Sequence, residues 1–399
     1  MNKLRILYHH RTQGRGGEGV HIREVVMALR DLGCIVQMQE APGVDALNAE
    51  ETQDHKNIDI AYRPLISRAF KYLSLRAPQF LFELAELSYN LWAFFPLSGK
   101  LKNGGVDVLY ERYAFFSYIG TSLAHRYGVP SVLEVNEIAG IERARNQAMP
   151  SLAKYIEKKV FQQADRILVV SSYLKQALVA RGVNEAKIHV IPNAVRADAL
   201  AGSGQPDGTI RQELKLGNRT VVGFLGQIVR WDRLDLLLED MVGFPDVHLL
   251  VVGPCRFMDE LLHKVDELSL RHTVTFTGAV ERDQVHAYID AMDICVLPHS
   301  NPFGSPIVMF EYMARRKPVL AVAVGPVTDV IEDDVNGCLF ADGDRGEFRN
   351  KLTQLVENPA LRLRIGNAGF DTVKKHHTWR RNAEQILEIF RGLEGVQGG

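Results

Sequence analysis

The sequence predicts an α/β protein built from two domains, each with a parallel sheet. Short apolar strand patterns alternate with helical patterns in two separate series along the chain. Residues 197–218, which are rich in Gly, Ser, Asp and Pro, separate the two series. The length of 399 residues also exceeds what one ordinary core accommodates. We expect an N-terminal domain over 1–195, a C-terminal domain over 196–377, and a terminal amphipathic helix over 378–395 that packs back on the first domain.

The first series opens with a strand, a glycine-rich loop and a helix. Leu4 to Tyr8 predicts a short buried strand, and a second strand follows the helix at 34–38. In open α/β sheets ligands bind beyond the carboxyl ends of the strands. We therefore expect the loop to face a ligand, with Gly16 and Gly17 offering backbone and His21 directed at the same space; a plain solvent-exposed turn is the alternative.

The same loop contains the spacing G-x-G-x-x-G from Gly14 to Gly19. An NAD-dependent oxidoreductase is therefore an alternative function, with Glu40 after the second strand as the ribose contact. That motif needs its first glycine at the end of the strand to make a tight turn. Here the segment His9 to Gln13 intervenes, and we disfavour this alternative.

Polar side chains follow the later strands of the first series. Strand patterns occur at 106–110, 131–135, 166–170 and 187–193. Glu111 and Arg112 end one of them, and Asn136 and Glu137 follow the next. We expect these four residues to line a ligand site, although simple pairing of Glu111 and Arg112 with their neighbours is the alternative.

The second series is centred on His299 to Ala323, where a buried strand pattern leads through a Gly/Pro loop into a helix. Backbone N–H groups at a helix start lack partners and attract anions. We therefore expect the amides of residues Gly304 to Ile307 to hold a diphosphate and Glu311 to contact hydroxyl groups. Taken alone, this turn is an ordinary loop, and Glu311 a residue that compensates the helix dipole.

Residues 62–97 are rich in aromatic residues and Leu, interleaved with Arg and Lys. Pro78 and Pro96 predict a division into two helical pieces. One hypothesis is an amphipathic face that contacts a membrane or a lipid-linked substrate; the other, which we favour, is helices that cover the sheet.

Composition excludes several classes of protein. A formal net charge of −1 offers no broad surface for nucleic acid. Four scattered cysteines without a C-x-x-C pair indicate a reduced, cytoplasmic chain, and no apolar stretch is long enough to span a bilayer. Asp342-Gly-Asp344 spells D-x-D, yet this sequence after a strand favours a turn over a metal site.

Several motifs together resemble retaining glycosyltransferase family 4, also called glycosyl transferases group 1. They are the glycine-rich loop with His21, Val190 to Asn193, Gly223 to Gly226, Val274 to Gly278, and the stretch from Phe303 to Val319 followed by Asn336-Gly337. The resemblance covers nearly the whole chain and implies the GT-B arrangement, in which two Rossmann-like domains face a cleft. It implies an acceptor side on the first domain and a nucleotide-sugar donor on the second.

The resemblance also implies site residues. Glu311 matches the second acid of the family's E-x7-E motif and is expected to hold the donor ribose, while Arg233, helped by Arg230, stabilises the leaving diphosphate. The remaining donor-binding candidates are Gly226, Gln227, Phe303, Gly304, Ser305, Pro306 and Ile307. Fixed cations can replace a metal in this chemistry, so we expect neither metal nor cofactor.

Three positions depart from the family pattern. Phe303 replaces the first acid of E-x7-E, Gln227 replaces an arginine, and Asn136 stands where many relatives have a histidine that faces the donor sugar. An amide can donate and accept hydrogen bonds but cannot act as a base near neutral pH.

The sequence thus predicts a retaining, metal-independent glycosyltransferase that moves a sugar from a nucleoside-diphosphate sugar to a hydroxyl of a glycan, a lipid-linked molecule or a small acceptor. A non-catalytic nucleotide-sugar-binding relative is an alternative, because the acid and the histidine are missing. An epimerase of the same fold is another, but it would need more acidic groups than the sequence offers.

Overall fold

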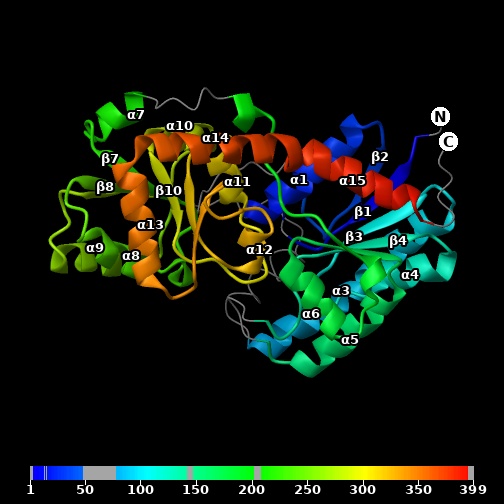
Figure 1. Ribbon diagram of the computed structural model, residues 1–399. Helices are drawn as coiled ribbons and strands as arrows, with labels where there is room; N and C mark the ends of the chain where they lie inside the picture. Colours follow the sequence, from blue (N-terminus) through cyan, green and yellow to red (C-terminus); the bar gives the residue numbers. More distant parts are fainter. Residues whose placement is uncertain are drawn as a thin grey trace. The chain divides into compact units, whose positions relative to one another are not determined.

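A computed structural model describes residues 3–12, 14, 16–47, 78–141, 147–201 and 208–393 of the chain (Figure 1). The chain divides into two compact units, Met1–Ile191 with Arg380–Gly399, and Pro192–Trp379. Each unit contains one parallel sheet covered by helices, as the alternating patterns predict.

The first unit alternates strands with helices. Its strands are β1 (Arg5–His9), β2 (Ile35–Gln39), β3 (Val108–Arg112), β4 (Ser131–Val135), β5 (Arg166–Val169) and β6 (Ile188–Val190). Its helices are α1 (Gly16–Asp31), α3 (Gln79–Lys102), α4 (Ile119–Tyr127), α5 (Pro150–Gln163), α6 (Ser172–Ala180) and α15 (Trp379–Arg391). The strand order is β2-β1-β3-β4-β5-β6, and all neighbouring pairs are parallel. β3 and β4 are buried at every position, as strands covered on both faces must be.

The second unit repeats this plan. Its strands are β7 (Thr220–Leu225), β8 (Val247–Val252), β9 (Val274–Phe276), β10 (Ile294–Leu297), β11 (Val319–Val322) and β12 (Cys338–Phe340), in the order β12-β11-β10-β7-β8-β9. Its helices are α7 (Gly208–Glu213), α8 (Leu234–Met241), α9 (Met258–Glu267), α10 (Val285–Ala291), α11 (Ile307–Ala314), α12 (Gly325–Thr328), α13 (Arg345–Glu357) and α14 (Pro359–His376). β10 and β7 are neighbours in the sheet, which brings the loops that follow them together.

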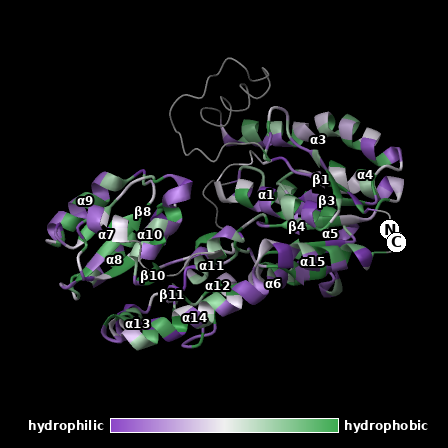
Figure 2. Cartoon of the chain, turned by 90° about the horizontal axis from the view of Figure 1, so that it is seen from above, coloured by the Kyte–Doolittle hydropathy of each residue, from purple (hydrophilic) through white to green (hydrophobic). Residues whose placement is uncertain are grey.

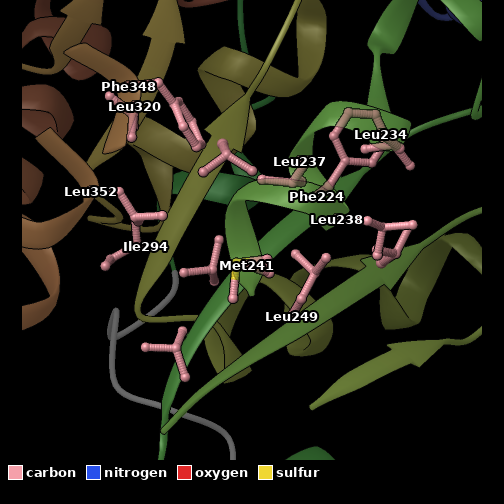
Figure 3. Close-up of a cluster of buried hydrophobic side chains, with 14 of the residues drawn as sticks. Phe224, Leu234, Leu237, Leu238, Met241, Leu249, Ile294, Leu320, Phe348 and Leu352 are labelled. Atoms are coloured by element: carbon pink, nitrogen blue, oxygen red, sulfur yellow. The ribbon is translucent and has the colours of Figure 1, made fainter. Parts of the chain in front are cut away.

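Successive residues of each strand point to opposite faces of the second sheet, where they pack into two separate cores. On one face, Phe224 and Leu249 pack with Met241 of α8 and with Phe348 and Leu352 of α13 (Figure 3). The other face is covered by α10 and α11, whose buried residues pack against strand residues such as Val221, Leu250 and Cys295.

The first sheet is likewise covered on both faces. Leu7 and Leu109 pack against α3 and α4 on one face. The ring of Tyr110 meets Phe390 of α15 with a centroid separation of 5.5 Å. The terminal helix thus belongs to the core of the first unit.

Helix α3 corrects the expected division at Pro96. The helix begins after Pro78, as predicted, but runs through Pro96 to Lys102. The prolyl ring removes one backbone hydrogen bond, yet Ala93, Leu97 and Leu101 are buried on both sides of it. Tertiary packing therefore outweighs the local cost. Residues 62–77 of the predicted first piece lie outside the described residues.

A glycine in α14 allows this helix to approach the chain that follows α11. A Cβ at Gly366 would lie 2.1 Å from the carbonyl oxygen of Arg316. We expect Gly366→Ala to lower the free energy of unfolding of the second unit by about 1–3 kcal/mol, measured by denaturant titration.

Gly99 of α3 is the matched control, because a Cβ there would meet nothing within 4 Å. Gly99→Ala should stabilise the first unit by up to ~1 kcal/mol through helix propensity alone. Equal effects of the two substitutions would contradict the assigned helix contact.

Candidate functional site

In the second unit, the hydroxyl group of Tyr312 joins helix α11 to the end of β7. The backbone N–H of Leu225 donates to the hydroxyl oxygen of Tyr312 over 2.6 Å. Tyr312 is fully buried, and its neighbour Glu311 lies on the partly exposed side of the helix. Tyr312 therefore ties helix α11 to the end of β7, where the loop beginning at Gly226 starts.

The loop after β7 carries both predicted arginines. Arg230 pairs with Glu260 at 2.6 Å and lies over the ring of Phe257, 4.8 Å from its centroid. Arg233 pairs with Asp235 at 3.1 Å in the left-handed backbone conformation, with φ of 53°. Both guanidinium groups are exposed and held by acids of their own unit, so an anionic ligand would have to compete with these carboxylates.

Close backbone packing fixes the shape of this loop. The N–H of Gly226 donates to the carbonyl oxygen of Val252 over 3.0 Å, and the N–H of Ile228 donates to the carbonyl oxygen of Pro254 over 2.9 Å. A Cβ on Gly253, whose φ is +130°, would lie 1.9 Å from the carbonyl oxygen of Gly226. These contacts hold the loops after β7 and β8 against each other. Gln227, which lies between Gly226 and Ile228 in the loop after β7, is exposed.

Asp232 lies between the two arginines and was absent from the sequence prediction. Its carboxylate accepts the N–H of Val229 over 2.8 Å. Burial raises the pKa of Asp232 to about 6, and the backbone hydrogen bond only partly opposes this shift. The loop therefore carries less negative charge in mildly acidic solution.

The loop before α11 uses several of its own backbone amides. Asn301 Oδ1 accepts the N–H of Phe303 over 3.1 Å and also that of Gly304. Ser305 accepts from Asn193 N over 3.1 Å, and the Asn193 side chain donates to Ser305 O over 2.7 Å. The expected set of phosphate-binding amides is therefore too broad, because Gly304 is already engaged and Pro306 has no N–H.

The amino-terminal end of α11 can still attract an anion. Among the described residues, no side chain caps this helix, so the N–H groups of Ile307 and Val308 are the remaining candidates. Glu311 lies in the second turn, and the first turn contains no acidic residue. The helix dipole therefore does not explain why an acid stands at this position.

In the first unit, three predicted residues converge on a carboxylate that was not predicted. Glu134 of β4 is buried and accepts from Tyr110 Oη over 2.7 Å and from Asn136 Nδ2 over 2.7 Å. Its other partners are the Arg112 guanidinium and His21 Nε2, the latter at 3.1 Å. His21, Arg112 and Asn136 thus meet at the carboxyl ends of β3 and β4.

Glu111 lies outside this group. Its side chain contacts His9 Nδ1 at 2.8 Å and accepts from Thr121 Oγ1 over 2.8 Å. A Cβ on Gly120 would lie 2.5 Å from the Glu111 carboxylate, so this acid is enclosed against α4. Successive strand residues point to opposite faces, which separates Glu111 from Arg112. The alternative of local pairing therefore describes Glu111 better than an exposed binding role.

The remaining residues predicted on this side are less enclosed. Gly16 and Gly17 are exposed in the first turn of α1, and Glu137 is partly buried. Glu134 could have been suspected from the sequence Ser-Val-Leu-Glu-Val, because an acid in an otherwise apolar buried strand needs partners. Tyr312 and Asn301 carry no comparable signal.

The described geometry does not favour dinucleotide binding. β1 ends at His9, well before Gly14, which has a positive φ of 66°. Glu40, the expected ribose contact, instead contacts His10 Nε2 at 3.0 Å and accepts from Ala46 N over 2.7 Å.

Within the described ranges, no group of three or more His, Cys, Asp or Glu side chains is placed to hold a metal ion. None of the helices in the described part of the chain is both long and apolar enough to cross a bilayer.

Two family models match the chain in succession. The model for Glycosyltransferase Family 4 matches residues 15–199, and that for Glycosyl transferases group 1 matches residues 207–372. D-inositol 3-phosphate glycosyltransferase of Mycolicibacterium gilvum is 28% identical over 296 residues, covering 71% of this chain and 65% of that protein.

Two solved structures share the fold over the whole chain or nearly all of it. A glycosyltransferase from Rickettsia africae superposes with a TM-score of 0.77 at 18% identity, covering 100% of both chains. Anabaena HepE in complex with UDP gives a TM-score of 0.69 at 17% identity, covering 98% of this chain and 100% of that one. The chain is a sugar-transferring enzyme and belongs to the family 4, group 1 glycosyltransferases with the GT-B fold.

Proposed function

We propose that the enzyme transfers a sugar from a nucleoside-diphosphate sugar to a hydroxyl acceptor with retention of configuration. The observation that carries this proposal is the hydrogen bond that ties α11, which carries Glu311, to the end of β7, from which the arginine-bearing loop leaves. UDP bound to a protein of the same fold supports the choice of donor class.

The second unit would bind the donor. Glu311 would accept hydrogen bonds from the ribose hydroxyls, because an ionised carboxylate is a strong double acceptor. The N–H groups of Ile307 and Val308 would meet the diphosphate at the start of α11. Arg233 and Arg230 would exchange Asp235 and Glu260 for phosphate oxygens, and Gln227 would lie beside them.

The reaction is governed by charge on the leaving group. The bond between the anomeric carbon and the diphosphate oxygen breaks, a bond from the acceptor oxygen forms, and the acceptor proton passes to the departing phosphate. Negative charge then grows on the phosphate, where positioned arginines stabilise it most. This scheme requires neither a protein base nor a cofactor, and the arginines take the role that a metal plays elsewhere.

The first unit would bind the acceptor near the group around Glu134. His21, Arg112 and Asn136 offer polar atoms there, and Gly16 and Gly17 offer exposed backbone. This set suits a polyhydroxylated acceptor such as a glycan or a small sugar, free or linked to lipid.

We further propose that α3 contacts a membrane. Its exposed side chains include large apolar ones, among them Leu91 at 73% and Phe95 at 76% exposure. Figure 2 shows hydrophobic residues, in green, along α3. Its two acids, Glu83 and Glu86, are both buried, and its last turn carries Lys100 and Lys102. An exposed apolar face without carboxylates suits an anionic lipid surface.

The donor proposal is tested by a thermal-shift screen with UDP-, GDP-, ADP- and dTDP-glucose. A donor at 100 times its Kd should stabilise the protein by about 2.7 kcal/mol. Glu311→Gln should weaken that donor by roughly 10- to 100-fold, the cost of losing a charged hydrogen bond. Arg233→Ala should lower kcat by about 10²–10³-fold through lost charge stabilisation.

Arg271→Ala is the matched control, since Arg271 also pairs with an acid of its own unit, Asp266, and is exposed. It lies before β9, at the amino ends of the strands, so donor affinity and kcat should stay unchanged. Wild-type values for Glu311→Gln and Arg233→Ala would refute the assigned roles, and donor binding without sugar transfer to any acceptor would indicate a non-catalytic relative.

The membrane proposal predicts loss of vesicle binding in Leu91→Ser/Phe95→Ser. Both side chains are exposed, so thermal stability should change little while co-flotation with phosphatidylglycerol vesicles falls at least several-fold. Leu363→Ser changes an apolar side chain of 65% exposure on α14 and should bind as wild type. Unchanged flotation of the double variant would remove α3 as the contact.

A further inference from the structure

A groove lies beside the outer strand of the first sheet. β6 is the last strand in the order of that sheet, and β5 pairs with it on one side. The groove, named the β6 groove, has a volume of about 660 Å³, which falls in the range of sites that hold small molecules. It is lined by the start of β5, by α6, by the β6 stretch to Ile191 and by the end of α15, all within the first unit.

The β6 groove is separate from the site proposed for the acceptor. The group around Glu134 lies on β4, and β5 lies between β4 and β6. Neighbouring strands are about 4.8 Å apart, which places β6 roughly 10 Å from β4. Arg166 is the first residue of β5, so this lining residue lies at the amino end of its strand, opposite the carboxyl end. None of the residues proposed above for the donor or the acceptor lines the groove.

Helix α15 supplies one wall of the groove. One stripe of this helix is buried in the core of the unit, namely Ala383, Ile386, Leu387 and Phe390. The neighbouring stripe lines the groove, namely Gln385, Glu388, Ile389 and the following Gly392. Residues three or four positions apart share one side of a helix. This wall therefore combines an amide, a carboxylate and an apolar side chain, a set that suits the hydroxyl groups and the C–H surface of a polyhydroxylated molecule.

The lining residues from β5 and α6 are cationic. The Arg166 guanidinium donates to the carbonyl oxygen of Asp165 over 2.9 Å, and no carboxylate of the described residues forms an ion pair with it. Lys175 pairs with Glu185 at 2.9 Å, but the side chain of Glu185 is 66% exposed. Exposed ion pairs of this kind are weak. An anionic ligand could therefore bind both cations without breaking a buried interaction.

His189 of β6 also lines the groove and senses these cations. Burial lowers the pKa of His189, and the positive charges of Arg166 and Lys175 lower it further. Its Nε2 atom is buried and has no hydrogen-bond partner in the part of the chain that the structure describes. The groove thus combines a positive field with a polar atom that the protein's own groups leave unsatisfied.

We propose that the β6 groove binds a phosphorylated sugar or polyol at a site distinct from those of the donor and the acceptor. Arg166 and Lys175 bind the phosphate, Gln385 and Glu388 bind hydroxyl groups, and Ile389 contacts the C–H surface of the ligand. The inference goes beyond the proposed function and does not depend on it, because the groove residues take no part in sugar transfer.

Isothermal titration calorimetry with glucose 6-phosphate tests this site. The wild type should bind glucose 6-phosphate, and Arg166→Gln and Lys175→Gln should each weaken binding by about tenfold or more, the effect of losing a charge-assisted hydrogen bond. Lys159→Gln is the matched control, because Lys159 is exposed and lies over the ring of Tyr155 on α5, outside the groove. Arg233→Ala should also bind as wild type, since it alters the donor site of the second unit.

Glucose and inorganic phosphate separate the two parts of the ligand. Each should bind at least several-fold more weakly than glucose 6-phosphate, because each makes only a part of the contacts. Inorganic phosphate that binds as tightly as glucose 6-phosphate would overturn the recognition of a sugar or polyol.

The imidazole of His189 provides a local readout that needs no enzyme activity. A phosphate bound beside it stabilises the imidazolium, so glucose 6-phosphate should raise the pKa of His189 in an NMR titration, with the signal assigned from His189→Gln. His248 is the internal control: burial lowers its pKa to about 4, but it belongs to the second unit, and its pKa should not change.

Three results would overturn the inference. The first is a wild type that does not bind glucose 6-phosphate. The second is binding that is lost in Arg233→Ala but kept in Arg166→Gln and Lys175→Gln, which would place the ligand in the donor site. The third is binding that leaves the pKa of His189 unchanged. A failure of sugar transfer would affect none of these measurements, so the proposed function and this inference are tested separately.

Discussion

Parallel strand pairing is the constraint on which the rest of this structure depends. Every described strand of each sheet runs in the same direction, so the loops that leave the carboxyl ends gather at one edge. Both faces of each sheet are covered by helices, which leaves that edge as the place where polar groups can meet a ligand. The residues assigned to chemistry in the two units all follow from this single geometric condition.

The carboxyl edges of the two sheets differ in how far their charged groups are buried. In the first unit, a charged cluster is enclosed, and Glu134 accepts hydrogen bonds from Tyr110, Arg112 and Asn136. Removing one partner from such a cluster leaves a buried polar group unpaired, at a cost of about 1–3 kcal/mol. The cluster therefore keeps its members in place.

In the second unit, the charged groups are exposed, and backbone hydrogen bonds fix the shape of the loops that carry them. The loops after β7 and β8 are joined by backbone hydrogen bonds, and Asn301 shapes the turn that leads into α11. Arg230 and Arg233 pair with local carboxylates, which the phosphate oxygens of the proposed donor would replace. A rigid frame with exchangeable cations suits a donor that must bind, react and leave as a diphosphate.

The sequence by itself determined the fold class, the alternation of the elements and the family, and it singled out the stretch around Glu311 as a candidate site. These follow from local patterns: apolar runs mark buried strands, and a Gly/Pro loop before a helical pattern marks a strand-to-helix turn. Only the tertiary structure decided that α3 continues through Pro96, that Glu111 turns toward His9, and that Glu134 gathers Arg112, His21 and Asn136. Each of these outcomes depends on residues far apart in the chain, and their burial and mutual hydrogen bonding have no counterpart in local spacing.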